Sequence, residues 1–176
     1  DIAATRLGEE VRVLIAELGM VGSLLRITLA AVAGDEPDPQ GRERCEMLVS
    51  ANPGQSPRPL RKVASGGELA RIRLALAVAP LGPDPVGSMI FDEVDTGIGG
   101  AVAEVVGQKL RALGGQRQVL CVTHLPQVAA QGHAHLRVSK HSDGDSTRTS
   151  IDKLDASGRR DELARMLGGV EITRET

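Results

Sequence analysis

The sequence predicts an α/β fold with a largely parallel core sheet flanked by helices. Two short apolar runs, at 88–92 and 118–123, indicate strands that are buried on both faces. The amphipathic segment 101–113 lies between them and indicates a helix. A strand, a helix and a second strand at this spacing form a βαβ unit, in which the two strands run parallel. The 176 residues suffice for one sizeable core.

The residues before this unit predict a helix, a pair of strands and a second helix. Apolar residues at helical spacing predict a helix over 5–18, which fits either an amphipathic core helix or the end of a coiled coil. Alternating patterns predict half-buried strands at 25–29 and 45–49, joined by a turn at 33–43. A rigid loop over 50–59 then leads into a helix at 65–79, which Pro80 ends.

The residues after the βαβ unit predict a hairpin and a final helix. Strands are expected at 135–140 and 147–154, with Asp143-Gly144 at the turn between them. A helix at 159–167 is expected to end at Gly168-Gly169.

Composition excludes several classes of function. Phe91 is the only aromatic residue, so the aromatic platforms that stack single-stranded bases are absent. The net charge of −2 argues against a broad DNA-binding face on this chain, although local basic patches remain possible. Cys45 and Cys121 lie far apart, which favours a reducing compartment, and no apolar run is long enough for a membrane span. The first residue, Asp1, is not Met and favours a fragment.

The start of the helix at 65–79 is the first candidate site. Ser65 is a good N-cap, and Glu68 three residues later completes the pattern of a capping box. Gly66 and Gly67 each cost up to about 1 kcal/mol in a helical turn. A phosphate bound to the free amides of the helix N-terminus would explain them, because glycine lets an anion approach the backbone. The alternative is a plain capping box with no ligand.

The carboxyl ends of the two parallel strands form the second candidate site. Asp92 and Glu93 follow the first strand, and His124 follows the second. Ligands of open α/β sheets bind at this edge. An aspartate there is suited to hold Mg²⁺ beside nucleotide phosphates, the glutamate to polarise an attacking water, and the histidine to orient that water. The alternative is that all three are ordinary surface residues.

Two other glycine and histidine patterns point less clearly to a site. Gly97 and Gly99 before a helix resemble part of a dinucleotide-binding fingerprint, but Val102 occupies the third glycine position. The nearby carboxylates would also repel a pyrophosphate. His133 and His135 lack further ligands at metal-binding spacing.

Three stretches together resemble a known family. They are "VASGGELAR" at 63–71, "MIFDEVDTGIGG" at 89–100 and "VLCVTHLPQVAA" at 119–130. They are similar to the C-terminal half of the ATPase head in the RecN family of bacterial DNA repair proteins, part of the SMC-like branch of the ABC ATPases. This resemblance implies the C-terminal lobe of an ABC/SMC-type P-loop ATPase head at 19–176, with 1–18 as the end of a coiled coil or a connecting helix.

The resemblance implies a role for the glycine-led helix start. Four residues match the signature motif, which in this family contacts the γ-phosphate of ATP held by the opposite head. They are Ser65, Gly66, Gly67 and Glu68.

The resemblance also implies roles at the strand ends. Asp92 matches the Walker B aspartate that helps to hold Mg²⁺, Glu93 the catalytic glutamate that acts as general base, and His124 the switch histidine. Residues 95–99 match the D-loop, but Gly99 stands where the family pattern usually has aspartate.

The family's phosphate loop, GxxxxGK[ST], does not occur in these residues. In this family it belongs to the N-terminal half of the head, so the isolated chain is expected to be inactive. The resemblance implies ATP and Mg²⁺ as cofactors, and the N-terminal half, a second head and DNA as partners. It implies a cytoplasmic, nucleoid-associated protein that hydrolyses ATP in DNA double-strand break repair and recombination. The alternatives are a non-catalytic protein-binding module and a dinucleotide-binding domain.

Overall fold

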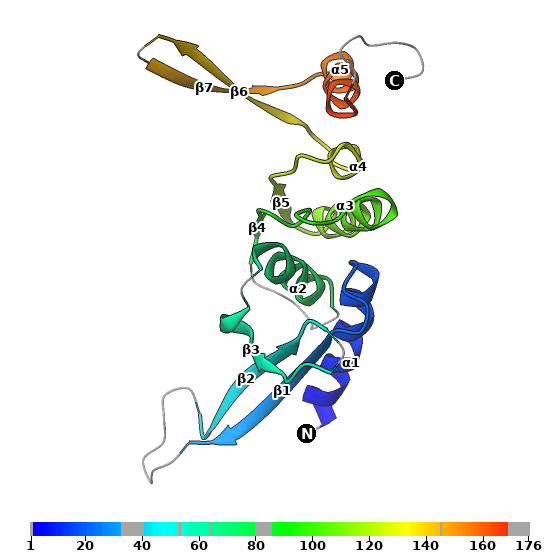
Figure 1. The fold of residues 1–176 in the computed structure, drawn as a ribbon, viewed down its shortest axis with the longest axis vertical. Helices are drawn as coiled ribbons and strands as arrows, with labels where there is room; N and C mark the ends of the chain where they lie inside the picture. The colour runs from blue at the N-terminus through cyan, green and yellow to red at the C-terminus, as the bar shows by residue number, and fades with distance from the viewer. Residues whose placement is uncertain are drawn as a thin grey trace.

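The computed structural model describes residues 2–32, 41–52, 54–63, 65–79, 86–144 and 146–168. The chain is elongated, with helix α1 and a hairpin at one end and a second hairpin with helix α5 at the other (Figure 1). Most of the expected turn at 33–43, and the helix stops at Pro80 and Gly169, lie outside the described residues. None of the described helices combines the length and apolar composition that a membrane span requires.

The N-terminal elements confirm the predicted helix and strand pair. Helix α1 (Ile2–Glu17) is followed by a turn at Gly19, whose φ of 84° suits glycine. Strands β1 (Leu24–Ala31) and β2 (Glu43–Ser50) pair antiparallel. The expected loop at 50–59 differs at its end, because β3 (Arg58–Pro59) pairs with β2 and a 3₁₀ turn, η1 (Leu60–Lys62), follows.

The βαβ unit forms as predicted. Strands β4 (Ser88–Phe91) and β5 (Gln118–Cys121) are parallel, with Ile90 opposite Leu120, and α3 (Gly100–Gly114) connects them. Helix α2 (Gly66–Val78) precedes the unit. The short helix α4 (Pro126–Ala129), which the sequence analysis does not predict, follows it.

One hydrophobic core joins α1, β1, β2, α2, β4, α3 and α4. Its fully enclosed side chains come mainly from the helices, because α2 packs against both α1 and α3. The largest of them are Ile15, Leu18, Ile72, Leu74, Val11, Val94 and Val106.

One face of the β4–β5 pair is uncovered, contrary to the prediction of strands buried on both faces. Phe91 points into the core, but Ile90 is 65% exposed and Leu120, directly opposite, is 41% exposed. Val122, just after β5, is 60% exposed. We call these three residues the open face; no element of the described chain packs on it. Parallel strands are normally covered on both sides, whereas the described residues cover only one side of this pair.

The C-terminal elements are the predicted hairpin and helix. Strands β6 (Leu136–Asp143) and β7 (Ser146–Lys153) pair antiparallel, and Gly144 has a φ of 60° at the turn. Figure 1 shows this hairpin projecting from the rest of the chain. Helix α5 (Ala156–Met166) begins three residues before the predicted start, because the Asp155 side chain caps it by accepting a hydrogen bond from the Gly158 N–H.

Candidate functional site

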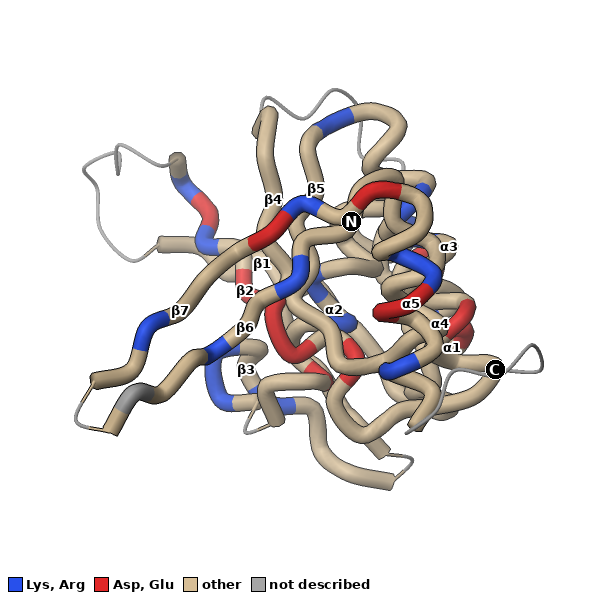
Figure 2. Tube along the Cα trace, turned by 90° about the horizontal axis from the view of Figure 1, so that it is seen from above, with Lys and Arg blue, Asp and Glu red and all other residues tan. Residues whose placement is uncertain are grey.

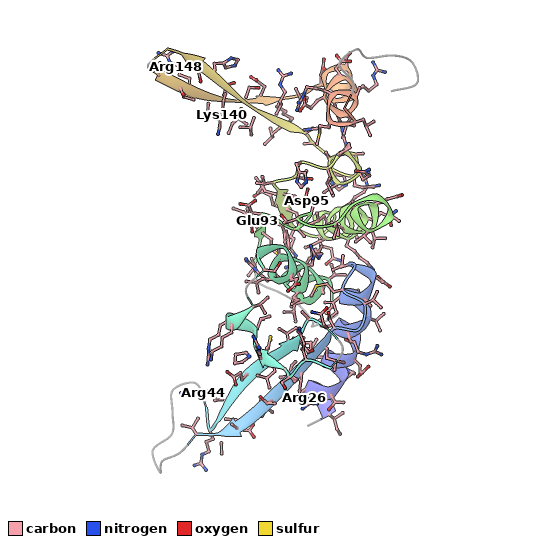
Figure 3. All side chains as sticks on the ribbon, in the orientation of Figure 1. Arg26, Arg44, Glu93, Asp95, Lys140 and Arg148 are labelled. Atoms are coloured by element: carbon pink, nitrogen blue, oxygen red, sulfur yellow. The ribbon has the colours of Figure 1, made fainter. Side chains whose placement is uncertain are left out.

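The carboxyl ends of β4 and β5 lie side by side, as the parallel register requires. Phe91 is paired with Cys121 at the last position of the two strands, so Asp92 and Glu93 leave the sheet beside the segment that carries His124. The structure therefore brings the turns after both strands to one edge. Figure 3 shows Glu93 and Asp95 together at this edge.

Asp95 links the two turns. Its side chain is only 3% exposed. One carboxylate oxygen, Oδ2, accepts hydrogen bonds from the Thr123 hydroxyl at 2.5 Å and from the His124 N–H at 3.1 Å, and lies 3.4 Å from His124 Nδ1. A buried carboxylate is costly unless it is paired and hydrogen-bonded, and these contacts satisfy it. Asp95 thus fixes the position of the segment that carries His124.

Glu93 has an unusual backbone. Its φ is 59°, and it is the only non-glycine residue with a positive φ among the described residues. The Glu93 N–H donates to Asp92 Oδ1 at 2.9 Å, and the Glu93 carbonyl accepts from the Thr96 N–H at 3.0 Å. Such strained conformations occur preferentially at functional sites, where the surrounding contacts hold them.

The N-terminus of α2 lies against the same turn. The Ser65 hydroxyl accepts a hydrogen bond from the Glu68 N–H at 3.3 Å, which is the first half of the predicted capping box. Gly66 is exposed, and a Cβ atom added to it would clash with the Glu93 carboxylate. An anion of the chain itself therefore lies beside this helix N-terminus, where partial positive charge favours it.

Gly67 has a structural explanation that its sequence context does not reveal. It is buried, and an added Cβ would lie 2.8 Å from the Thr96 carbonyl oxygen and 3.1 Å from Thr96 Cβ. The turn after β4 and the first turn of α2 approach so closely that only glycine fits. Packing within the chain thus accounts for Gly67, whereas Gly66 remains accessible.

Arg71 is a second organising residue that the sequence pattern does not single out. It is 6% exposed, and its Nη1 donates to the Thr96 carbonyl at 2.8 Å and the Val94 carbonyl at 3.4 Å. Burial holds the pKa of Arg71 below its ordinary value, an effect that nearby Glu68 opposes. Arg71 therefore ties α2 to the turn that carries Glu93 and Asp95.

Cys121, at the end of β5, has an inert thiol. Burial, with the negative charges of Asp95 and Asp92, raises the pKa of Cys121 to about 12. The thiol is neutral at physiological pH and is not a nucleophile here.

The edge is compatible with a magnesium ion that is coordinated mainly by water and by the phosphate oxygens of a bound molecule. The described residues contain no cluster of three potential metal-ligating side chains. Asp92 is exposed and uses Oδ1 to accept the Glu93 N–H, so its other oxygen is available. Mg²⁺ commonly takes one or two carboxylates together with water and phosphate oxygens, and this donor set fits that mode.

Known structures share this fold at low sequence identity. The Smc head domain with a coiled coil and joint from Pyrococcus yayanosii has a TM-score of 0.63 and 21% identity, covering 93% of this chain and 29% of that one. A structure reported for ATP-driven dimerization and DNA-stimulated activation of SMC ATPases has a TM-score of 0.54 and 19% identity, covering 94% of this chain and 93% of that one. The chain has the fold of part of an SMC-type head, and the predicted α/β fold is confirmed.

Sequence relatives are closer. The DNA repair protein RecN of Xylella fastidiosa strain Temecula1 is 60% identical over 98% of this chain, and that of Vibrio cholerae is 53% identical over 78%. No protein-family model matches the chain. The chain spans 31% of the length of the Xylella protein and 25% of the Vibrio protein. Over the part of their length that it spans, the chain belongs to the RecN family.

Proposed function

We propose that this chain is the C-terminal lobe of an ATPase head that binds and hydrolyses ATP during DNA double-strand break repair and recombination. The observation that carries the proposal is the carboxyl edge of β4–β5, which gathers Asp92, Glu93 and His124 around the buried Asp95. The relatives are named as DNA repair proteins, and the fold is that of SMC heads. The complete protein would act in the cytoplasm at the nucleoid.

The open face supports the proposal that the N-terminal half of the head packs against this chain. Ile90, Leu120 and Val122 present an apolar surface beside the proposed site. Such a surface on a parallel pair favours a covering layer. The missing layer would be the N-terminal half of the head, which would bring the phosphate loop to the same edge. Residues 2–17, helix α1, would then be the connection to a coiled coil.

The site residues have distinct proposed roles. Asp92 would hold Mg²⁺, and the ion would supply positive charge to neutralise charge that develops on the phosphates. The Glu93 carboxylate would accept the proton of the attacking water, and His124, oriented by Asp95, would donate to the γ-phosphate region. From the second head, the signature residues 65–68 would offer free helix N-terminal amides to the same phosphate.

The contact between Glu93 and Gly66 adds a condition to this scheme. A γ-phosphate at the signature helix would meet the carboxylate of the same chain, and the two anions would repel each other. Phosphate binding in trans therefore requires Glu93 to turn away from Gly66 toward its own nucleotide. Binding of ATP would thereby replace the contact between Glu93 and Gly66 within one chain by a contact between the γ-phosphate and the signature helix of the second head.

The test is Glu93→Gln in the complete protein. Loss of the general base should lower kcat by about 10²- to 10⁴-fold. ATP-bound dimers should accumulate, measured by size-exclusion chromatography with ATP and Mg²⁺. The matched control is Glu104→Gln, because Glu104 is exposed on α3 and accepts a hydrogen bond from Gln108 within its own helix. Normal turnover in Glu93→Gln would refute the proposed role.

A complementation assay separates this proposal from a non-catalytic binding module. The isolated chain should show no ATP turnover, since it lacks the phosphate loop, and the N-terminal half added in trans should restore it. An adaptor would remain silent in both conditions.

A further inference from the structure

A cationic cavity lies away from the strand edge. It has a volume of about 620 Å³ and opens between the end of α3, the segment after α4, and the first turns of α5. Figure 1 shows α3, α4 and α5 following one another in this part of the molecule. Neither Glu93 nor His124 lines the cavity, so it is separate from the proposed ATP site. Its ionisable lining residues are Arg111, Arg159, Arg160, His133, His135 and Asp155.

Two of these arginines are held in place by backbone carbonyls. Arg111 Nη1 donates to the Gln131 carbonyl at 2.7 Å. Arg159 Nη2 donates to the Ala130 carbonyl at 2.7 Å and to the Ala129 carbonyl at 3.2 Å. Guanidinium groups from α3 and α5 thus converge on three consecutive carbonyls at the end of α4. Each guanidinium has five N–H donors, so further donors remain on both.

The positive charge of the cavity is not balanced. No ion pair joins a carboxylate to Arg111, Arg159 or Arg160 within the described part of the chain. The only lining carboxylate, Asp155, accepts the Gly158 N–H at 2.7 Å as the N-cap of α5. Three arginines against one carboxylate leave an excess of two positive charges among these four side chains.

His135 independently indicates an unsatisfied polar environment. Its Nδ1 is buried and has no hydrogen-bond partner. Burial, and then the positive charge of Arg159, hold the pKa of His135 below its ordinary value, while Glu162 opposes this shift. Glu162 is itself engaged by Arg165 at 2.6 Å. A buried polar atom without a partner is unusual and calls for a ligand or water.

We propose that this cavity binds a phosphate group, provided either by a small phosphate-bearing molecule or by the DNA backbone. Arginine pairs with phosphate through parallel N–H donors. Arg160 is exposed and forms no ion pair with a described residue, so its guanidinium is available to a ligand, and the clamped Arg111 and Arg159 supply preorganised donors beside it. The opposing reading is that Arg111 and Arg159 serve only to clamp three helices together.

Arg160→Ala tests the proposal without breaking the clamp, because Arg160 takes no part in the hydrogen bonds to the residues after α4. The intact chain is titrated with sodium phosphate at constant ionic strength, following the ring signals of His133 and His135 by NMR. A second arm measures fluorescence anisotropy of a labelled 20-base-pair duplex DNA. Phosphate should shift both histidine signals, and Arg160→Ala should weaken binding about tenfold, as for loss of one charged hydrogen-bond partner.

The matched control is Arg73→Ala, since Arg73 is an exposed arginine on α2 that does not line this cavity. It should leave binding unchanged. If only phosphate binding is sensitive to Arg160→Ala, the ligand is a small phosphate compound; if DNA binding is sensitive as well, the ligand is the nucleic-acid backbone. Unmoved histidine signals, or equal affinity of Arg160→Ala and the parent chain in both arms, would overturn the proposal. Neither result depends on ATP hydrolysis.

Discussion

The core around α2 and the C-terminal hairpin differ sharply in how they bury apolar side chains. Ile72 on α2 is 0% exposed in the shared core, whereas Ile151 on β7 is 65% exposed. The N-terminal elements pack around α2 and α3, and the ribbon β6–β7 has both faces in solvent. Figure 2, seen from above, shows the charged residues along this ribbon. An isolated two-stranded ribbon is marginally stable in water, so we expect this hairpin to add little to the stability of the chain.

The largest expected change in the free energy of unfolding is found by comparing a buried isoleucine with an exposed one. Ile72→Ala should lower the free energy of unfolding by about 2–5 kcal/mol, because it removes enclosed side-chain atoms and leaves a cavity. Ile151→Ala should change it by less than about 0.5 kcal/mol, as for other exposed positions. Urea denaturation monitored by circular dichroism measures both. Similar losses for the two variants would show that the hairpin is packed in solution.

An intermediate change in the free energy of unfolding is expected when a buried aspartate and an exposed aspartate are each replaced by asparagine. Asp95→Asn should cost about 1–3 kcal/mol, because the neutral amide oxygen accepts the hydrogen bonds from Thr123 and His124 more weakly than a carboxylate does, and the amide adds N–H donors at a buried position. Asp152 on β7 is 54% exposed and lies 3.9 Å from Arg137, so Asp152→Asn should cost less than about 1 kcal/mol. The same urea titration compares them. If Asp95→Asn were as mild as Asp152→Asn, Asp95 would not be the link between the two turns.

The smallest expected effect is a difference in alkylation rate between the two cysteines. Because burial and nearby carboxylates raise the pKa of Cys121 to about 12, iodoacetamide at pH 8 should modify exposed Cys45 well before Cys121. A raised pKa in the folded state means that the neutral thiol favours folding. This contribution is complete below about pH 9, the ordinary pKa of the thiol, and is lost as pH rises toward 12. Mass spectrometry of the alkylated chain gives the two rates, and equal rates would contradict the shift.

Sequence patterns predict the elements because periodicity and capping are local. Helix 65–79, the βαβ unit and the C-terminal hairpin are confirmed on that basis. Helix α4 is missed because four residues carry too little periodicity, although Pro126 at its first turn is a usable signal. The early start of α5 is missed because Gly158 in its first turn obscures the cap at Asp155.

The site is predicted only in part. The parallel register requires that Asp92, Glu93 and His124 share one edge, so their neighbourhood follows from the sequence; their catalytic roles remain predictions. The linking role of Asp95 depends on a turn that folds back to His124. Burial of Arg71 and Gly67 against Thr96 likewise arises only from tertiary contact. Such contacts have no periodic signature in the sequence.

The left-handed backbone at Glu93 bears on how the proposed catalytic role of this residue weighs against the stability of the fold. A side chain in that conformation costs about 1 kcal/mol that glycine would not incur. A sequence selected for thermal endurance alone would place glycine at this turn. The chain instead carries Glu93 at this turn. Its left-handed backbone lowers the stability of the fold, but it sets the direction in which the carboxylate leaves the sheet.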